Sequence, residues 1–158
     1  MATGLWHLEI LIPAWRIVFA VRGPEIIELR GASTQGTFSA YRELPDSVPG
    51  MIAWPNTVLL TGPETVIVDP GYQTQGDMLA GALAARGLEP ADVSTAVMTH
   101  LHPDHVSALP QLGPVDLHVH EDELPEPYAE RLRGARDETT VLPLRGSEGE
   151  ILPGLRWI

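Results

Sequence analysis

Three histidines and one aspartate lie close together in the stretch THLHPDHV at positions 99–106. His100 and His102 are two residues apart, so in an extended segment they point to the same side and could bind one metal ion. Asp104 and His105 follow at a turn and could reach a second metal ion. Zinc accepts imidazole nitrogens and carboxylate oxygens, and two metals about 3.5–4 Å apart can polarise a carbonyl or phosphoryl group. The spacing therefore predicts a metal site rather than histidines of an ordinary loop.

The elements around this stretch must place it at the end of a buried strand. Apolar and β-branched runs predict strands at 7–12, 16–21, 56–62, 65–71, 94–100, 115–120, 139–144 and 150–158. Apolar residues at helical spacing predict helices at 77–87, 104–113 and, interrupted by prolines, 121–134. The Gly, Ser, Thr and Pro of 31–50 predict a loop. Strands that come first in pairs and then alternate with helices predict an α/β or α+β layered fold.

Composition restricts the classes of partner. The chain has 158 residues, which predicts one domain, and a formal net charge of −11, which disfavours nucleic acids and anionic membrane surfaces. It contains no cysteine, so disulfides and zinc–thiolate sites are excluded. The apolar N-terminal stretch lacks a basic start and is interrupted by Glu9, Pro13 and Arg16. We therefore expect a cytoplasmic protein that neither spans nor binds a membrane.

The motifs together resemble those of the metallo-β-lactamase superfamily. THLHPDH resembles its His-x-His-x-Asp-His signature. The segment NTVLLTGPETVIVDPG at 56–71 looks like the strand–turn–strand that ends in the family's Asp-x-Gly motif, carried here by Asp69 and Gly71. The resemblance covers roughly residues 52–158, and 1–50 are less distinctive. It implies an αββα sandwich with the metals at the edge between the two sheets.

The resemblance also implies roles for individual residues. His100 and His102 would bind the first metal, and Asp104 and His105 the second. Asp69 would lie behind these ligands and orient the histidine loop, and the hydroxyl of Thr99 would add a hydrogen bond. From the residues alone, Asp69 reads equally well as a turn aspartate before Pro-Gly.

The family completes its site with three further ligands: a His in a Thr-Pro-Gly-His-Thr-like loop, a bridging Asp and a last His. No His follows position 120 in this chain. The resemblance therefore implies a single domain over 1–158, truncated, with its sandwich incomplete at the C-terminus. A complete site would hold two Zn²⁺, with iron or manganese as alternatives, but metal would bind weakly here. The uncovered sheet would favour a homodimer or another chain that covers the missing half.

Other polar residues leave alternatives open. His118 and His120 share one face of a predicted strand and could bind metal, although the resemblance places no ligands there. His7 is isolated and is expected to be structural. Glu121, Asp122 and Glu123 follow that strand and are predicted to be acids at a helix N-terminus.

The implied function is a metal-dependent hydrolase of a small-molecule ester, thioester, lactone or amide. A metal-bound hydroxide would attack the carbonyl, Asp104 would orient it as the catalytic residue, and the metals would stabilise the oxyanion. The acidic charge argues against nucleases, and the lack of a secretory signal argues against a periplasmic β-lactamase. Lactonase-like and glyoxalase II-like hydrolases remain.

Two alternatives stay open. Iron at the same ligands would support oxidoreductase chemistry, as in persulfide dioxygenases and flavodiiron proteins. A truncated domain could also fold without independent activity.

Overall fold

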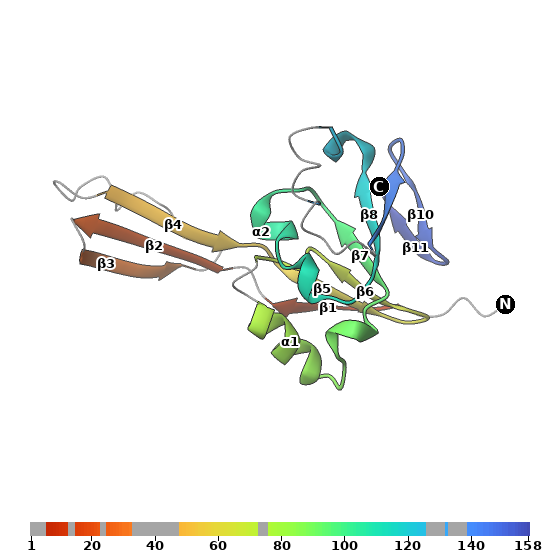
Figure 1. Cartoon of the computed structure of the whole chain (residues 1–158), viewed down its shortest axis with the longest axis horizontal. Helices are drawn as coiled ribbons and strands as arrows, with labels where there is room; N and C mark the ends of the chain where they lie inside the picture. Colours follow the sequence, from red (N-terminus) through yellow and green to blue (C-terminus); the bar gives the residue numbers. More distant parts are fainter. Residues whose placement is uncertain are drawn as a thin grey trace.

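The structure is a computed structural model of the chain (Figure 1). It describes residues 6–12, 15–22, 25–32, 48–72, 76–125, 132 and 139–158, and for 12, 15–22, 25–32, 48–54, 76 and 77 it describes the backbone only. Its main element is a six-stranded sheet in the order β1-β5-β6-β7-β8-β9. These strands are β1 (His7–Ile12), β5 (Thr57–Thr61), β6 (Thr65–Val68), β7 (Thr95–Met98), β8 (Asp116–His120) and β9 (Thr140–Leu144).

The sheet combines an antiparallel half and a parallel half. β1, β5 and β6 pair antiparallel, and the predicted turn at Gly62 and Pro63 joins β5 to β6. β6, β7, β8 and β9 pair in parallel, in the register Val68↔Val97 and Met98↔Val119. Parallel strands are covered on both faces and read as apolar runs, as TVIV and TAVM do here. The carboxyl ends of these strands therefore meet at one edge.

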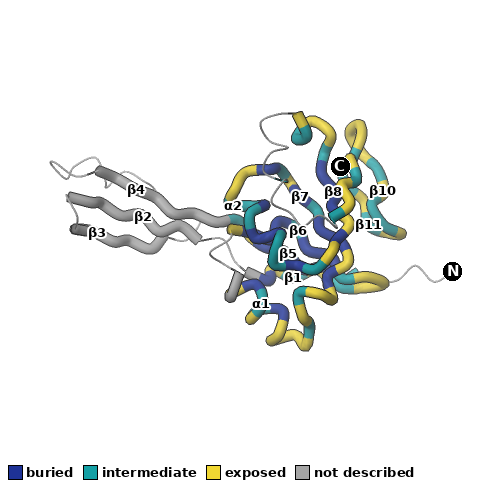
Figure 2. The backbone as a smooth tube through the Cα atoms, viewed as in Figure 1, coloured by how far each residue is buried: buried dark blue, intermediate teal, exposed yellow. Residues whose placement is uncertain are grey.

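The core includes the residues packed between this sheet and helix α1 (Gly76–Ala84), and in Figure 2 the tube of the central strands is mostly buried. Leu79 and Leu83 are four residues apart on α1, so both point to the sheet, and both are fully buried. Burial of each such side chain stabilises the fold by about 1.5–3 kcal/mol. At the rim, Arg86 donates to both carboxylate oxygens of Glu9 at 2.6 and 2.9 Å, which ties the turn after α1 to β1. The predicted α/β layered fold is confirmed.

Two smaller sheets accompany the main one. β3 (Glu25–Ala32), β2 (Trp15–Arg22) and β4 (Val48–Trp54) form a three-stranded antiparallel sheet in that order, which projects to one side in Figure 1. The loop predicted at 31–50 is wrong at both ends, because β3 extends to residue 32 and β4 begins at 48; residues 33–47 lie outside the described part of the chain.

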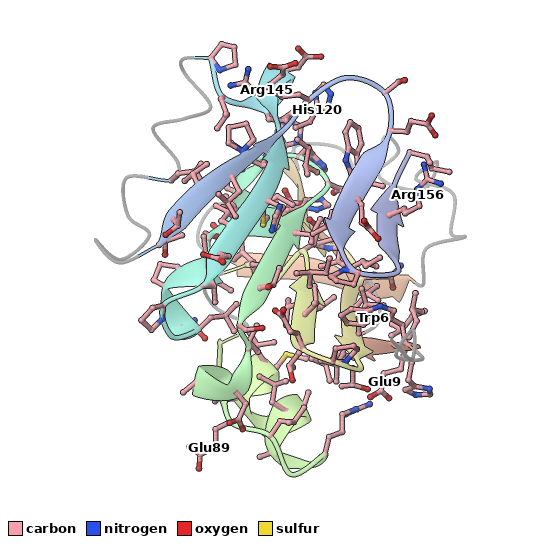
Figure 3. All side chains as sticks on the ribbon, turned by 90° about the vertical axis from the view of Figure 1, so that its right-hand side faces the viewer. Trp6, Glu9, Glu89, His120, Arg145 and Arg156 are labelled. Atoms are coloured by element: carbon pink, nitrogen blue, oxygen red, sulfur yellow. The ribbon has the colours of Figure 1, made fainter. Side chains whose placement is uncertain are left out.

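The last two strands form a hairpin of their own. β10 (Gly149–Leu152) and β11 (Leu155–Trp157) pair antiparallel around Gly154, whose φ of 80° suits a tight turn. The indole of Trp6, labelled in Figure 3, donates to the carbonyl of Pro153 at 3.1 Å. The ring of Trp157 packs edge-on against His120 at 5.5 Å between ring centres. The hairpin is thereby fastened to both β8 and the N-terminal segment.

The helices are shorter than predicted. The helix expected at 104–113 is a single turn, α2 (Pro103–Val106), followed by the 3-10 turn η4 (Leu109–Gln111), because Pro110 has no N–H to continue an α-helix. From the helix expected at 121–134, the structure describes the 3-10 turn η5 (Glu121–Glu123); residues 126–131 and 133–138 lie outside the described part. A third 3-10 turn, η3 (Pro90–Asp92), precedes β7. Among the described helices, none is long and apolar enough to cross a membrane.

Candidate metal centre

The histidine stretch lies where the chain leaves the central strand β7. β7 ends at Met98, the backbone is extended at His102, and α2 begins at Pro103. β6 ends beside β7 because Val68 pairs with Val97, so Asp69 lies next to Thr99. The carboxyl ends of parallel strands are the usual place for a site in an open α/β sheet.

Asp69 joins the end of β7 to α2. Its carboxylate, only 4% exposed, accepts hydrogen bonds from the Thr99 N–H at 2.9 Å and from the Thr99 hydroxyl at 2.6 Å. The same carboxylate lies 2.9 Å from Nδ1 of His105. Its backbone has a φ of 51°, a left-handed conformation that Asp tolerates better than most residues. These contacts go beyond those of an ordinary turn aspartate.

The hydrogen bonds indicate which ring nitrogens carry protons. Nδ1 of His105 faces the Asp69 carboxylate, so its proton belongs there and Nε2 keeps its lone pair. The Thr99 hydroxyl donates to Asp69, so it accepts from Nδ1 of His100 at 3.1 Å. Nε2 of His100 therefore also carries no proton, and its lone pair can bind a metal ion. Both imidazoles are in the tautomer that suits a metal ligand.

His100 and His102 bring one nitrogen each to a common point. Nε2 of His100 and Nδ1 of His102 are 3.1 Å apart, and the two rings meet edge to face with an angle of 81° between them. Two nitrogens that bind one tetrahedral zinc at about 2.0–2.1 Å are roughly 3.3 Å apart. The pair therefore fits the spacing that one zinc ion requires.

Asp104 and His105 form the second pair. An oxygen of Asp104 lies 3.8 Å from Nε2 of His105, the nitrogen that Asp69 leaves available. The rings of His105 and His100 are 3.9 Å apart between centres, so the two pairs are neighbours. The side chain of Asp104 is 38% exposed and can reach a ligand from solution. A carboxylate and an imidazole are a donor set that zinc accepts.

The rings of His100 and His105, which are both partly buried, differ in their affinity for protons. Burial lowers the pKa of His100, and the neighbouring His105 and His102 lower it further. Burial would also lower the pKa of His105, but its hydrogen bond to Asp69 and the charges of Asp69 and Asp104 outweigh burial and raise it. His100 is therefore predisposed to the neutral form that binds metal, whereas His105 holds a second proton up to a higher pH than an ordinary histidine does.

The described residues supply the candidate metal-binding side chains as two separate pairs. No group of three or more His, Asp or Glu side chains within the described ranges is arranged to hold one metal ion. The chemistry and spacing of each pair fit zinc, and each pair needs further donors to complete a tetrahedral site. The predicted site residues His100, His102, Asp104, His105, Asp69 and Thr99 are thus brought together, and their binding of metal stays a prediction.

The other predicted histidines are placed differently. His120 donates from Nε2 to the carbonyl of Gly146 at 2.8 Å and accepts at Nδ1 from the Asp122 N–H at 3.2 Å, so both nitrogens are used within the fold. His118 is buried in β8, where burial lowers its pKa. His7 is exposed on β1. The arrangement gives His120 a structural role.

Glu123 is the residue whose place the sequence did not predict. It was expected to be an acid at a helix N-terminus, but its carboxylate accepts a hydrogen bond from the Leu101 N–H, between the first two histidines, at 2.9 Å. The contact arises because β8, which ends directly before Glu123, is the parallel neighbour of β7, and the sequence alone does not give this strand order.

Comparison with known proteins identifies relatives of the chain. The chain is 37% identical over 90 residues to metallo-beta-lactamase domain-containing protein 1 from Homo sapiens, a match that covers 57% of this chain and 33% of that protein. The chain thus spans about a third of the length of that curated relative.

Solved structures share the fold at low sequence identity. A quorum-quenching N-acyl homoserine lactone lactonase matches with a TM-score of 0.57 and 20% identity, over 99% of this chain and 62% of that one. A metal-soaked flavodiiron core from Synechocystis matches with a TM-score of 0.51 and 14% identity, over 64% of this chain and 26% of that one. The predicted metallo-β-lactamase-type fold is confirmed. Residues 55–153 match the family model described as the metallo-beta-lactamase superfamily, and the chain belongs to that family.

Proposed function

We propose that this chain carries part of the metal centre of a hydrolase that cleaves small-molecule esters, thioesters or lactones. The observation that carries the proposal is the 3.1 Å approach of Nε2 of His100 and Nδ1 of His102. Membership of the superfamily and the fold shared with a lactonase support it.

His100 and His102 would hold one zinc ion, and Asp104 and His105 a second. When bound, zinc would polarise the carbonyl of the substrate and lower the pKa of a water molecule. Asp69 and Thr99 would keep the rings of His100 and His105 in the required tautomers through the hydrogen bonds already described.

Asp104 is the proposed catalytic residue. Its carboxylate is partly exposed and lies at the edge of the cluster, whereas that of Asp69 is buried behind it. An exposed carboxylate next to the His105 ring can accept a hydrogen bond from an incoming water and orient it toward a carbonyl carbon.

Each pair would need donors from outside the described residues, from another part of a longer protein, a second copy or another chain. We propose a homodimer or such a partner as their source. With the present donors alone, we expect weak metal binding.

The test is a calorimetric titration of the metal-free protein with Zn²⁺, combined with hydrolysis assays on an N-acyl homoserine lactone and a thioester. We expect Zn²⁺ binding, turnover of at least one substrate, and loss of turnover in Asp104→Asn. The matched control is Asp122→Asn, because Asp122 is 86% exposed and lies beside His120.

Two results would replace the proposal. Zinc binding without turnover would indicate a domain that lacks independent activity. Bound iron in the purified protein, with oxygen-dependent turnover, would indicate an oxidoreductase.

A further inference from the structure

Leu101 is held on two sides. Its side chain is fully buried in the hydrophobic core. Its backbone N–H donates to Oε2 of Glu123 at 2.9 Å in a partly buried setting. A hydrogen bond to a charged acceptor is stronger than one between neutral groups.

The position of Leu101 controls the histidines on each side of it. The N–H that Glu123 accepts belongs to the peptide between His100 and Leu101. Rotation of that peptide would turn the His100 side chain relative to that of His102. The 3.1 Å separation of their nitrogens therefore depends on the plane in which Glu123 holds the peptide.

Glu123 also places a carboxylate close to the histidine pair, because its Oε2 lies 2.9 Å from the nitrogen of the peptide that follows His100. Negative charge placed behind a pair of imidazole ligands strengthens their attraction for a cation.

The two acids before Glu123 point elsewhere. An oxygen of Glu121 lies 4.0 Å from Arg145, and Asp122 lies 3.4 Å from Nδ1 of His120. Glu121 and Asp122 are exposed, whereas Glu123 is partly buried. The three consecutive acids therefore provide their own matched controls.

We propose that Glu123 is a positioning residue for the His100–His102 pair, which it orients through the Leu101 N–H and supports with its negative charge. The metal-binding part of this inference rests on the proposed function. The orienting part concerns the metal-free protein and is independent of it.

The test compares Glu123→Ala and Glu123→Gln with wild type and with Glu121→Ala and Glu121→Gln. In the metal-free protein, NMR measures amide hydrogen exchange at Leu101 and the imidazole signals of His100 and His102. We expect Leu101 to exchange at least about 10-fold faster in Glu123→Ala, with shifted signals of both rings. Glu123→Gln keeps an acceptor oxygen, so it should restore most of the protection.

A titration with Zn²⁺ then separates the effect of the negative charge of Glu123 from the effect of its hydrogen bond to Leu101. We expect Glu123→Gln to lower Zn²⁺ affinity about 10-fold despite the restored exchange protection, and Glu121→Gln to change it less than about 2-fold. A role in stability alone would leave the affinity of the folded Gln variant unchanged. If Glu123→Ala does not fold, Glu123→Met, which removes the acceptor but keeps most of the side-chain volume, takes its place in the exchange and ring-signal measurements.

Unchanged Leu101 exchange and ring signals in folded Glu123→Ala, or equal changes in Glu121→Ala, would overturn the inference. If wild type binds no Zn²⁺, the proposed function fails, and the exchange and ring signals still decide whether Glu123 orients the pair.

Discussion

The chain contains the pattern His-x-His twice, once after the end of β7 and once within its parallel neighbour β8, and the two copies differ in role. His100 and His102 follow the end of β7, and their nitrogens converge to 3.1 Å. His118 and His120 lie within β8, where His118 is buried and His120 bonds to Gly146 and Asp122. Identical spacing has produced a candidate metal pair in one place and structural residues in the other.

The difference comes from the backbone. Residues i and i+2 of a regular strand lie on one face about 6.6–6.8 Å apart, so their rings can converge only if both are free to turn toward one point, and the packing of His118 and the hydrogen bonds of His120 within β8 prevent this. Beyond Met98 the chain leaves the strand, and hydrogen bonds from Thr99 to the Asp69 carboxylate fix the first residue after the strand. A His-x-His pair therefore acquires ligand geometry where a strand ends and a carboxylate fixes the exit.

The strongest test of this contrast removes one histidine from each pair. We expect His100→Ala to lower Zn²⁺ affinity at least about 100-fold, because even loss of a group behind a ligand costs about 10–100-fold. His120→Ala should change the Zn²⁺ affinity less than about 3-fold, because both ring nitrogens of His120 already form hydrogen bonds with Gly146 and Asp122. Calorimetric titration of both variants gives the measurement, and equal losses would abolish the distinction between the pairs.

The second-largest effect concerns the aspartates beside the two histidine pairs, which should differ in their contribution to the free energy of unfolding. Asp69→Asn should lower the free energy of unfolding by about 2 kcal/mol, because a buried carboxylate loses charge-assisted bonds with Thr99 and His105. Asn also tolerates the left-handed backbone at this position, so the change isolates the side chain. Urea denaturation of the variant and of wild type measures this difference.

Asp122→Asn is the counterpart beside His120 and should stay within about 0.5 kcal/mol of wild type. A similar loss in both variants would show that Asp69 does no more for its pair than the exposed Asp122 does.

The smallest effect concerns the acid sensitivity contributed by His118. Burial lowers its folded pKa below the ordinary value of 6.5, so the unfolded chain takes up a proton first as pH falls. The stability due to neutral His118 is fully present above pH 6.5 and is lost as pH falls through that value toward the folded pKa. We expect His118→Leu to show a smaller loss of stability than wild type between pH 7.5 and 5.5, measured by urea denaturation.

The exposed His7→Leu should follow the wild-type pH dependence. An unchanged pH dependence in His118→Leu would mean that the buried ring does not contribute to acid sensitivity.

Part of the fold follows from local sequence. TVIV and TAVM are short β-branched runs that suit buried parallel strands, and both were placed correctly. β4 was missed in part because VPGMIAW begins with Pro and Gly, residues typical of a turn, and its pairing with distant β2 decides its conformation. Local propensity carries no information about such a partner.

The site shows the same division. The histidine stretch is contiguous, and the motif around Asp69 suggested its role, so these residues could be proposed from sequence. Glu123 could not, because its contact with Leu101 depends on β8 lying in parallel register beside β7. A carboxylate that reaches a loop across a sheet becomes apparent only when the strand order is known.

The position of the centre at adjoining strand ends has a consequence for folding. Asp69 meets Thr99 across 30 positions of chain, and Leu101 meets Glu123 across 22. Closing segments of that length costs little more conformational entropy than closing shorter ones. The contacts of the centre are nevertheless long-range, so we expect its donors to come together only when the parallel crossovers from β6 to β8 have closed, and not during formation of the local hairpin of β5 and β6.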